Sequence, residues 1–164
     1  MVFTFGKFTI DVDVEKNRTF YQTAEALTAG CRCNGCMNFE KAADSFPESV
    51  RDFFQGLGVD PRKPAEAYVN CSEENGKKLF YGGFYHLCGT VLKDNNAWIS
   101  QEVDGITTVS YINEDYLYEI DDGYYVIFGN GGDALLEDGF PAPVITMDIE
   151  FHVPWVLNES NDYK

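Results

Sequence analysis

The strictest pattern in the sequence is the alternation of apolar and polar residues between positions 145 and 153. The apolar residues are Ile145, Met147, Ile149, Phe151 and Val153, and the polar ones are Thr146, Asp148, Glu150 and His152. Because successive side chains of a β-strand point to opposite faces, this segment predicts a strand with one buried face. Such a strand requires neighbouring strands at its edges and a second layer over its apolar face.

Other extended segments supply the neighbouring strands. Residues Val2–Phe5 and Phe8–Val14 flank a Gly6-Lys7 turn and predict an N-terminal hairpin. Asn75-Gly76 is typical of a hairpin turn between two later strands. The remaining predicted strands are Ala65–Cys71, Lys78–Leu92, Trp98–Val103, Thr107–Ile112, Tyr116–Ile120 and Tyr124–Phe128. In the longest of them, Gly82-Gly83 indicates a bulge or a place where another backbone passes closely.

Three helices are predicted in the first third of the chain. Two of them cover Arg18–Ala29 and Met37–Asp44. The third follows a capping box, in which Ser45 is the predicted N-cap and Glu48 stands three residues later. Its apolar stripe at helical spacing is Val50, Phe53, Phe54 and Leu57, and Gly58 is the expected stop.

Helices gathered early and strands gathered late predict the α+β class. We expect an N-terminal hairpin and about three short helices packed on one face of a mainly antiparallel sheet. A length of 164 residues suits a single domain spanning 1–164.

The net charge of −15 is carried almost entirely by the C-terminal half. Residues 1–93 hold 12 acids and 11 bases, whereas residues 94–163 hold 15 acids and no Lys or Arg. Because nucleic-acid binding depends on cationic side chains at phosphates, this distribution argues against a nucleic-acid partner. Two interpretations remain open, a solvated face that maintains solubility and a surface that captures a basic protein.

The sequence contains neither a membrane span nor a secretion signal. It has no run of about eighteen apolar residues, and its first residues lack a basic region followed by an apolar one. We therefore expect a cytoplasmic protein without a membrane partner. In that compartment an odd set of five cysteines favours metal binding, redox chemistry or buried thiols over structural disulfides.

Three of the cysteines, Cys31, Cys33 and Cys36, lie within six residues. The intervening Asn34-Gly35 pair can turn the chain sharply, which is typical of a zinc knuckle. His86 is the predicted fourth ligand and Cys88 the alternative, because residues two apart on a strand face the same way; Cys71 is a further option. Inert, buried thiols explain the same residues equally simply, and a redox function or a local disulfide is also open.

Cys36 also precedes a predicted helix, whose N-terminal amides would stabilise a thiolate. A thiol-dependent enzyme would need a histidine base within hydrogen-bond reach of this sulfur. The sequence offers only His86 and His152 for that role.

Three runs, CRCNGCMNFEKAADSFPESVRDFFQGLGVDPRKPAEAY, YGGFYHLCG and FHVPWVL, occupy much of the stretch from residue 31 to 157. With them the chain resembles a family of uncharacterised bacterial proteins that has a CxCxxCxNF turn and a terminal Pro-Trp. The resemblance implies a grouping without an assigned activity. The resemblance implies that the positions most relevant to a site are Cys33, Cys36 and His86.

These observations support three functional hypotheses. The leading one is a non-catalytic protein that contacts a basic protein partner through an acidic, tyrosine-rich C-terminal sheet. The tyrosines concerned are Tyr111, Tyr116, Tyr118, Tyr124 and Tyr125. The alternative is a zinc-binding protein whose closed cysteine-rich site is structural, and the second alternative is a small thiol-dependent enzyme.

Overall fold

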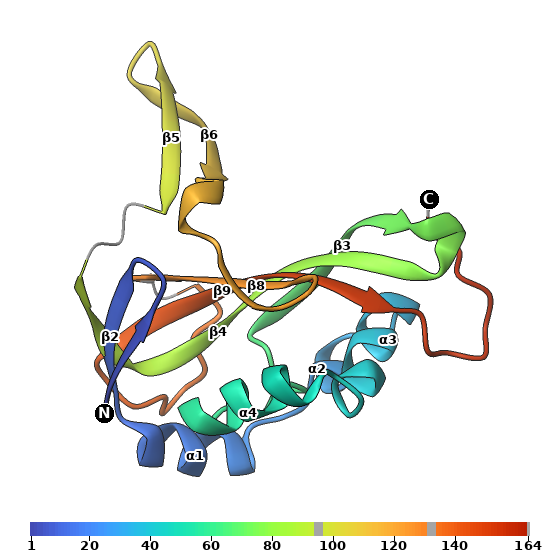
Figure 1. Ribbon diagram of the computed structural model, residues 1–164, viewed down its shortest axis with the longest axis horizontal. Coiled ribbons are helices and arrows are strands. Elements are labelled where there is room, and N and C mark those ends of the chain that lie inside the picture. The colour runs from blue at the N-terminus through green and yellow to red at the C-terminus, as the bar shows by residue number, and fades with distance from the viewer. Residues whose placement is uncertain (94–96, 131–133, 164) are drawn as a thin grey trace.

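A computed structural model describes residues 1–93, 97–130 and 134–163, apart from the side chains of residues 107–109 (Figure 1). Over these residues the fold is mixed α+β, as predicted, with four α-helices and nine strands. The helices are α1 (Val14–Thr23), α2 (Leu27–Gly30), α3 (Asn34–Ala43) and α4 (Glu48–Leu57). The strands are β1 (Val2–Phe5), β2 (Phe8–Val12), β3 (Glu66–Glu73), β4 (Lys78–Lys93), β5 (Trp98–Val103), β6 (Ile106–Ile112), β7 (Tyr118–Asp121), β8 (Tyr124–Gly129) and β9 (Val144–Pro154).

The main sheet has seven antiparallel strands in the order β1-β2-β4-β9-β8-β7, with β3 also paired to β4. The long strand β4 organises this sheet. One of its edges pairs with β3 in its first half and with β2 in its second, and the other edge pairs with β9 from Lys78↔Pro154 to Cys88↔Val144. The predicted alternation in β9 is confirmed, because its five apolar side chains are at most 2% exposed.

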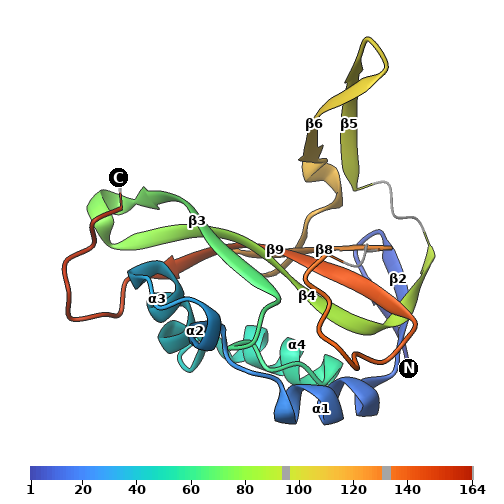
Figure 2. The same ribbon diagram turned by 180° about the vertical axis from the view of Figure 1, so that it is seen from behind.

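The helices cover one face of the sheet, and the core lies between the two layers (Figure 2). The predicted stripe of α4 supplies part of it: Val50, Phe54 and Leu57 are buried, while Phe53 is half-buried. Phe54 packs edge-on against Tyr85 of β4, with ring centroids 5.0 Å apart. Full burial of such a side chain contributes about 1.5–3 kcal/mol, so this stripe fixes α4 on the sheet.

The first helices differ from the predicted ones, and α3 starts at Asn34, three residues before the predicted Met37. The helix expected at Arg18–Ala29 is divided into α1 and α2, and α1 begins earlier because the Asp13 side chain accepts a hydrogen bond from the Lys16 amide (3.1 Å). Val14 therefore opens a helix and does not extend β2.

The predicted capping box is wrong. Pro47 is the N-cap of α4, which has no side-chain cap hydrogen bond, and the Ser45 hydroxyl instead donates to the Ala42 carbonyl (3.1 Å) at the end of α3. The expected stop at Gly58 is confirmed, since this residue adopts a left-handed conformation with φ of +74°.

The adjacent glycines Gly82 and Gly83 in β4 mark a close passage, as predicted. A Cβ at Gly83 would lie 2.2 Å from the carbonyl oxygen of Glu66 on β3, and one at Gly82 would lie 2.6 Å from the Tyr68 ring. Because any larger residue would collide with β3, these positions allow the two strands to stay in contact.

Strands β5 and β6 form a separate two-stranded sheet, called the arm here and covering residues 98–112. Figures 1 and 2 show the arm projecting away from both the main sheet and the helices.

Candidate metal centre

The turn between α2 and α3, residues 31–36, brings the three clustered cysteines together and is called the cysteine turn below. Cys31 directly follows α2, Cys33 is the N-cap of α3 and Cys36 lies in the first turn of α3. Their sulfur atoms all lie within 4.8 Å of one another, and the Sγ atoms of Cys31 and Cys33 are 3.4 Å apart. The predicted convergence of these three side chains is therefore present. This group of thiols can hold a metal ion.

Two tyrosines from distant parts of the chain hold the backbone of this turn. The Tyr81 hydroxyl donates to the Gly35 carbonyl (2.8 Å), and the Tyr163 hydroxyl accepts from the Gly35 amide (3.1 Å). A Cβ at Gly35 would lie 2.6 Å from the Tyr163 hydroxyl and 2.9 Å from a methyl group of Val69. The sequence has glycine at the one position of the turn where three side chains converge on the backbone.

Asn38 fastens α3 to the end of β9. This fully buried side chain accepts from the Val156 amide (2.7 Å) and donates to the Pro154 carbonyl (3.1 Å) and the Tyr81 hydroxyl (3.3 Å). Because buried polar groups are costly when they lose their partners, these bonds fix the position of the cysteine turn on the sheet.

The three thiols differ in exposure and acidity. Partial burial raises the pKa of Cys33, but hydrogen bonds from the Cys36 amide, from the Cys31 and Cys36 thiols and from the Tyr163 hydroxyl outweigh it and bring the pKa to about 7. Burial raises the pKa of Cys36 well above its usual value, and the neighbouring Cys31 and Cys33 sulfurs raise it further. Cys31 and Cys33 are exposed, whereas Cys36 is buried.

The helix N-terminus therefore favours the thiolate of Cys33, and not that of Cys36 as the sequence suggested. The physical reason is the helix boundary. Because α3 starts at Asn34, Cys33 occupies the capping position, and its sulfur accepts from the Cys36 amide at 3.5 Å.

The structure places the predicted fourth ligand, His86, outside the cysteine group. Its ring is 3% exposed and lies 5.4 Å from the Phe84 ring and 5.6 Å from the Phe140 ring, measured between centroids. Burial lowers the pKa of His86, which a hydrogen bond with the Ala134 backbone partly offsets. Among the described residues its Nε2 atom has no hydrogen-bond partner.

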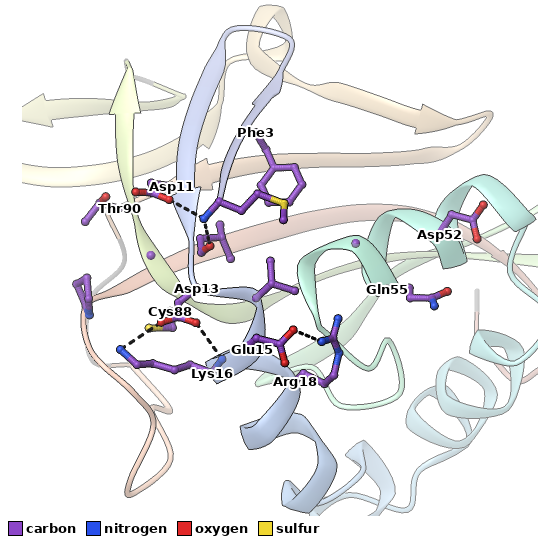
Figure 3. A pocket seen from close by; sticks show the side chains of 16 residues that line it. Phe3, Asp11, Asp13, Glu15, Lys16, Arg18, Asp52, Gln55, Cys88 and Thr90 are labelled. Atoms are coloured by element: carbon purple, nitrogen blue, oxygen red, sulfur yellow. Dashed lines mark hydrogen bonds and ion pairs between the residues drawn. The ribbon is translucent and has the colours of Figure 1, made fainter.

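The alternative fourth ligand, Cys88, lies in the wall of a surface pocket of about 910 Å³ beside α1 (Figure 3). Its thiol contacts the Ala142 carbonyl (3.5 Å), and its amide donates to Asn17 (2.8 Å). The charged side chains that line this pocket largely pair with one another. For example, the Lys16 ammonium lies 3.3 Å from the Asp13 carboxylate. Cys88 is not part of the cysteine group either.

The other candidate residues, Cys71 and His152, also lie outside the three-cysteine group. Cys71 is exposed on β3, and His152 contacts Glu73 (2.7 Å) and stacks on Phe80. Within the described ranges, the ligand group contains three cysteines and no histidine.

Sequence reasoning missed Tyr81, Asn38 and Tyr163, which support the turn. A signal existed for Asn38, because it lies one helical turn from both Gly35 and Ala42, on the buried face of α3. No local signal existed for Tyr163, which is 128 residues from the glycine it contacts.

Together, the fold and the site define an α+β protein with a three-cysteine group able to hold a metal ion. Comparisons of the chain with protein family models, curated proteins and solved structures found no match. The resemblance to a bacterial family consequently stays a prediction. In the described part of the chain, no helix has both the length and the apolarity needed to cross a membrane.

Proposed function

We propose that the protein binds zinc through Cys31, Cys33 and Cys36. The observation that supports this function is the convergence of three sulfurs within 4.8 Å on one short turn. Zn–S bonds of about 2.3 Å in tetrahedral geometry separate two ligand sulfurs by about 3.8 Å. The spacing of 3.4 Å between Cys31 and Cys33 is close to this value. Small side-chain rotations would complete the fit.

The surroundings of the sulfurs suit thiolate ligands. The Tyr163 hydroxyl lies 3.9 Å from the Cys33 sulfur, and the Cys36 amide points at the same atom. Donors of this kind orient a ligand and tune its charge without binding the metal themselves. Because the Cys36 thiol is protonated at neutral pH without metal, binding must release its proton, and affinity should fall as the pH falls.

Such a site would keep an open coordination position. The described residues add no histidine, carboxylate or further cysteine to the group, and two of its three thiols are exposed. A closed structural site requires four protein ligands, as the sequence suggested, whereas three leave one position for water or an external ligand. The proposed site is therefore accessible and exchangeable.

The test is a titration of the reduced full-length chain with zinc in competition with a chromophoric chelator. We expect about one zinc per chain, released by acid, and a thiolate-to-metal absorption band when cobalt replaces zinc. Cys33→Ser should weaken binding by about tenfold or more, whereas Cys71→Ser, which removes an exposed thiol outside the group, should leave it unchanged.

Two results would overturn the proposal. One is a wild-type chain that takes up less than about a tenth of an equivalent of zinc. The other is an equal loss of affinity in both variants, which would show that binding does not depend on the cysteine turn.

A further inference from the structure

The arm is attached to the rest of the molecule at its base. There the Asn113 amide donates to the Ala97 carbonyl (2.7 Å), the Trp98 side chain bonds to Asp148, and Ile112 packs at the edge of the core. In the described structure, β5 and β6 pair only with each other, so no third strand lies along either outer edge of the ribbon. An isolated two-stranded hairpin is marginally stable in water, and a covering layer would complete it.

The strand register gives the arm one apolar face. Directly opposed residues of an antiparallel pair share a face, and Ile99 opposes Tyr111 while Val103 opposes Ile106. Positions 99 and 103 are four apart on β5, so both pairs lie on the same side. The other side includes Ser100 and Ser110, whose hydroxyls are hydrogen-bonded at 3.0 Å. This side also carries the Trp98–Ile112 pair at the base of the arm, so the two sides differ in polarity mainly beyond the base.

The apolar face of the arm is uncovered. Ile106 is 67% exposed, Val103 56% and Tyr111 44%, and the remaining large exposed apolar side chain of the arm is Trp98. Gln101 lies between Ile99 and Val103 on this side of β5. Exposed apolar side chains gathered on one side of an element mark a site of interaction more often than scattered ones do. Of the five tyrosines predicted to form a contact surface, Tyr111 is exposed, Tyr124 is buried and the other three are half-buried. The exposed tyrosine surface is therefore smaller than the five-tyrosine surface that the sequence predicted, and its exposed member, Tyr111, belongs to the arm.

Charge indicates which partner suits this face. The arm contains Glu102 and Asp104 and no basic residue, within a segment of 70 residues, 94–163, that has no Lys or Arg. A second copy would bring the same net charge of −15, and a nucleic acid would bring phosphates, so both would be repelled. A protein with a basic surface would be attracted and oriented.

We propose that the arm docks a basic protein segment that adds a strand to one outer edge of the ribbon and extends the side that carries Ile99, Val103, Ile106 and Tyr111. Strand addition supplies backbone hydrogen bonds along that edge, and alternate apolar side chains of the added strand lie beside these four and bury part of their exposed surface. Lysine or arginine side chains on its other face would lie near Glu102 and Asp104.

The test uses a synthetic peptide of alternating lysine and valine as the probe, titrated into the full-length chain. Binding should weaken as salt is added. The double variant Val103→Ser, Ile106→Ser should bind at least about tenfold more weakly, because it removes the two most exposed apolar side chains of the arm, beside its turn. The control Val2→Ser removes an equally exposed valine on β1 (59%) and should change affinity by less than about twofold. A peptide of alternating glutamate and valine should not bind.

Equal binding by the double variant and the wild type would overturn the proposal, as would equal binding of the acidic peptide. Sedimentation equilibrium provides a third outcome. A wild-type dimer that the double variant dissociates would make a second copy the occupant of the arm and would also overturn it. If the double variant unfolds by circular dichroism, Tyr111→Ser replaces it. None of these variants changes a cysteine, so the zinc proposal is tested separately.

Discussion

The cysteine turn and the arm are held in opposite ways. Hydrogen bonds from β4, from the end of β9 and from Tyr163 converge on Gly35 and Asn38, so several parts of the chain fix the turn. The arm is fixed at its base, and its two strands beyond that point rely on each other.

This difference matches the two kinds of ligand proposed. A metal ion requires ligand atoms placed within a few tenths of an ångström, which only a well-supported turn provides. A protein partner can supply the missing layer itself, so an incompletely packed ribbon is sufficient before binding. Three predictions sharpen or break this comparison.

The largest effect is expected among the thiols of the metal-free cysteine turn. Alkylation of Cys33 at pH 7 should exceed that of Cys36 by more than about a hundredfold, because the exposed thiol has a pKa of about 7 and burial raises the pKa of the other. Below pH 7 the Cys33 rate should fall about tenfold per pH unit as the thiolate is protonated.

Mass spectrometry of iodoacetamide-treated protein measures both rates. In Tyr163→Phe the midpoint for Cys33 should move to higher pH, because one donor to its sulfur is lost. A Cys33 midpoint near the ordinary thiol value of about 8.5 in the wild type would show that the packing of the turn does not act on this sulfur.

Removing one side-chain hydrogen-bonding group from each region should give very different losses of stability. Asn38→Ala removes a buried side chain that accepts from the Val156 amide and donates to the Pro154 carbonyl and the Tyr81 hydroxyl, so the free energy of unfolding should fall by about 2–4 kcal/mol. Ser100→Ala removes the exposed hydrogen bond to Ser110 on the arm and should change it by less than about 0.5 kcal/mol. Urea unfolding measures both, and similar losses would contradict the comparison.

A smaller effect is expected from adding one methyl group at the cysteine turn. Gly35→Ala would force the Tyr163 hydroxyl and Val69 apart, which should cost about 1–3 kcal/mol of unfolding free energy. Gly30→Ala, at the end of α2, has no atom within 4 Å of the added carbon and should be neutral or stabilising by less than about 1 kcal/mol. Thermal unfolding distinguishes them, and a neutral Gly35→Ala would show that the contact with Tyr163 does not constrain the turn.

Local patterns were sufficient for much of the fold. The alternation in β9, the stripe of α4 and the N-terminal hairpin are properties of short segments, and all three are present. The convergence of Cys31, Cys33 and Cys36 was predicted from a sharp turn at Asn34-Gly35, but these two residues open α3, so the start of this helix brings the sulfurs together. Helix boundaries failed where local signals competed, as at Ser45, which bonds back to α3 and does not cap α4.

The surroundings of the site could not be predicted, because they depend on which strands become neighbours. His86 and Cys88 share a face by spacing alone, but the position of β4 places them against Phe140 and Ala142, away from the cysteine turn. The exposure of the arm has a similar origin. Its sequence alternates like any strand, and only the topology leaves β5 and β6 outside the main sheet.

The contact between Tyr163 and Gly35 has a consequence for biosynthesis. The cysteines leave the ribosome together with Gly35, which precedes by 128 residues the tyrosine that braces it. At about 5–20 residues per second, they spend roughly 6–26 s without that brace. During this interval the nascent thiols are open to oxidants and to free metal ions, and their final geometry is reached only after the last strand has paired.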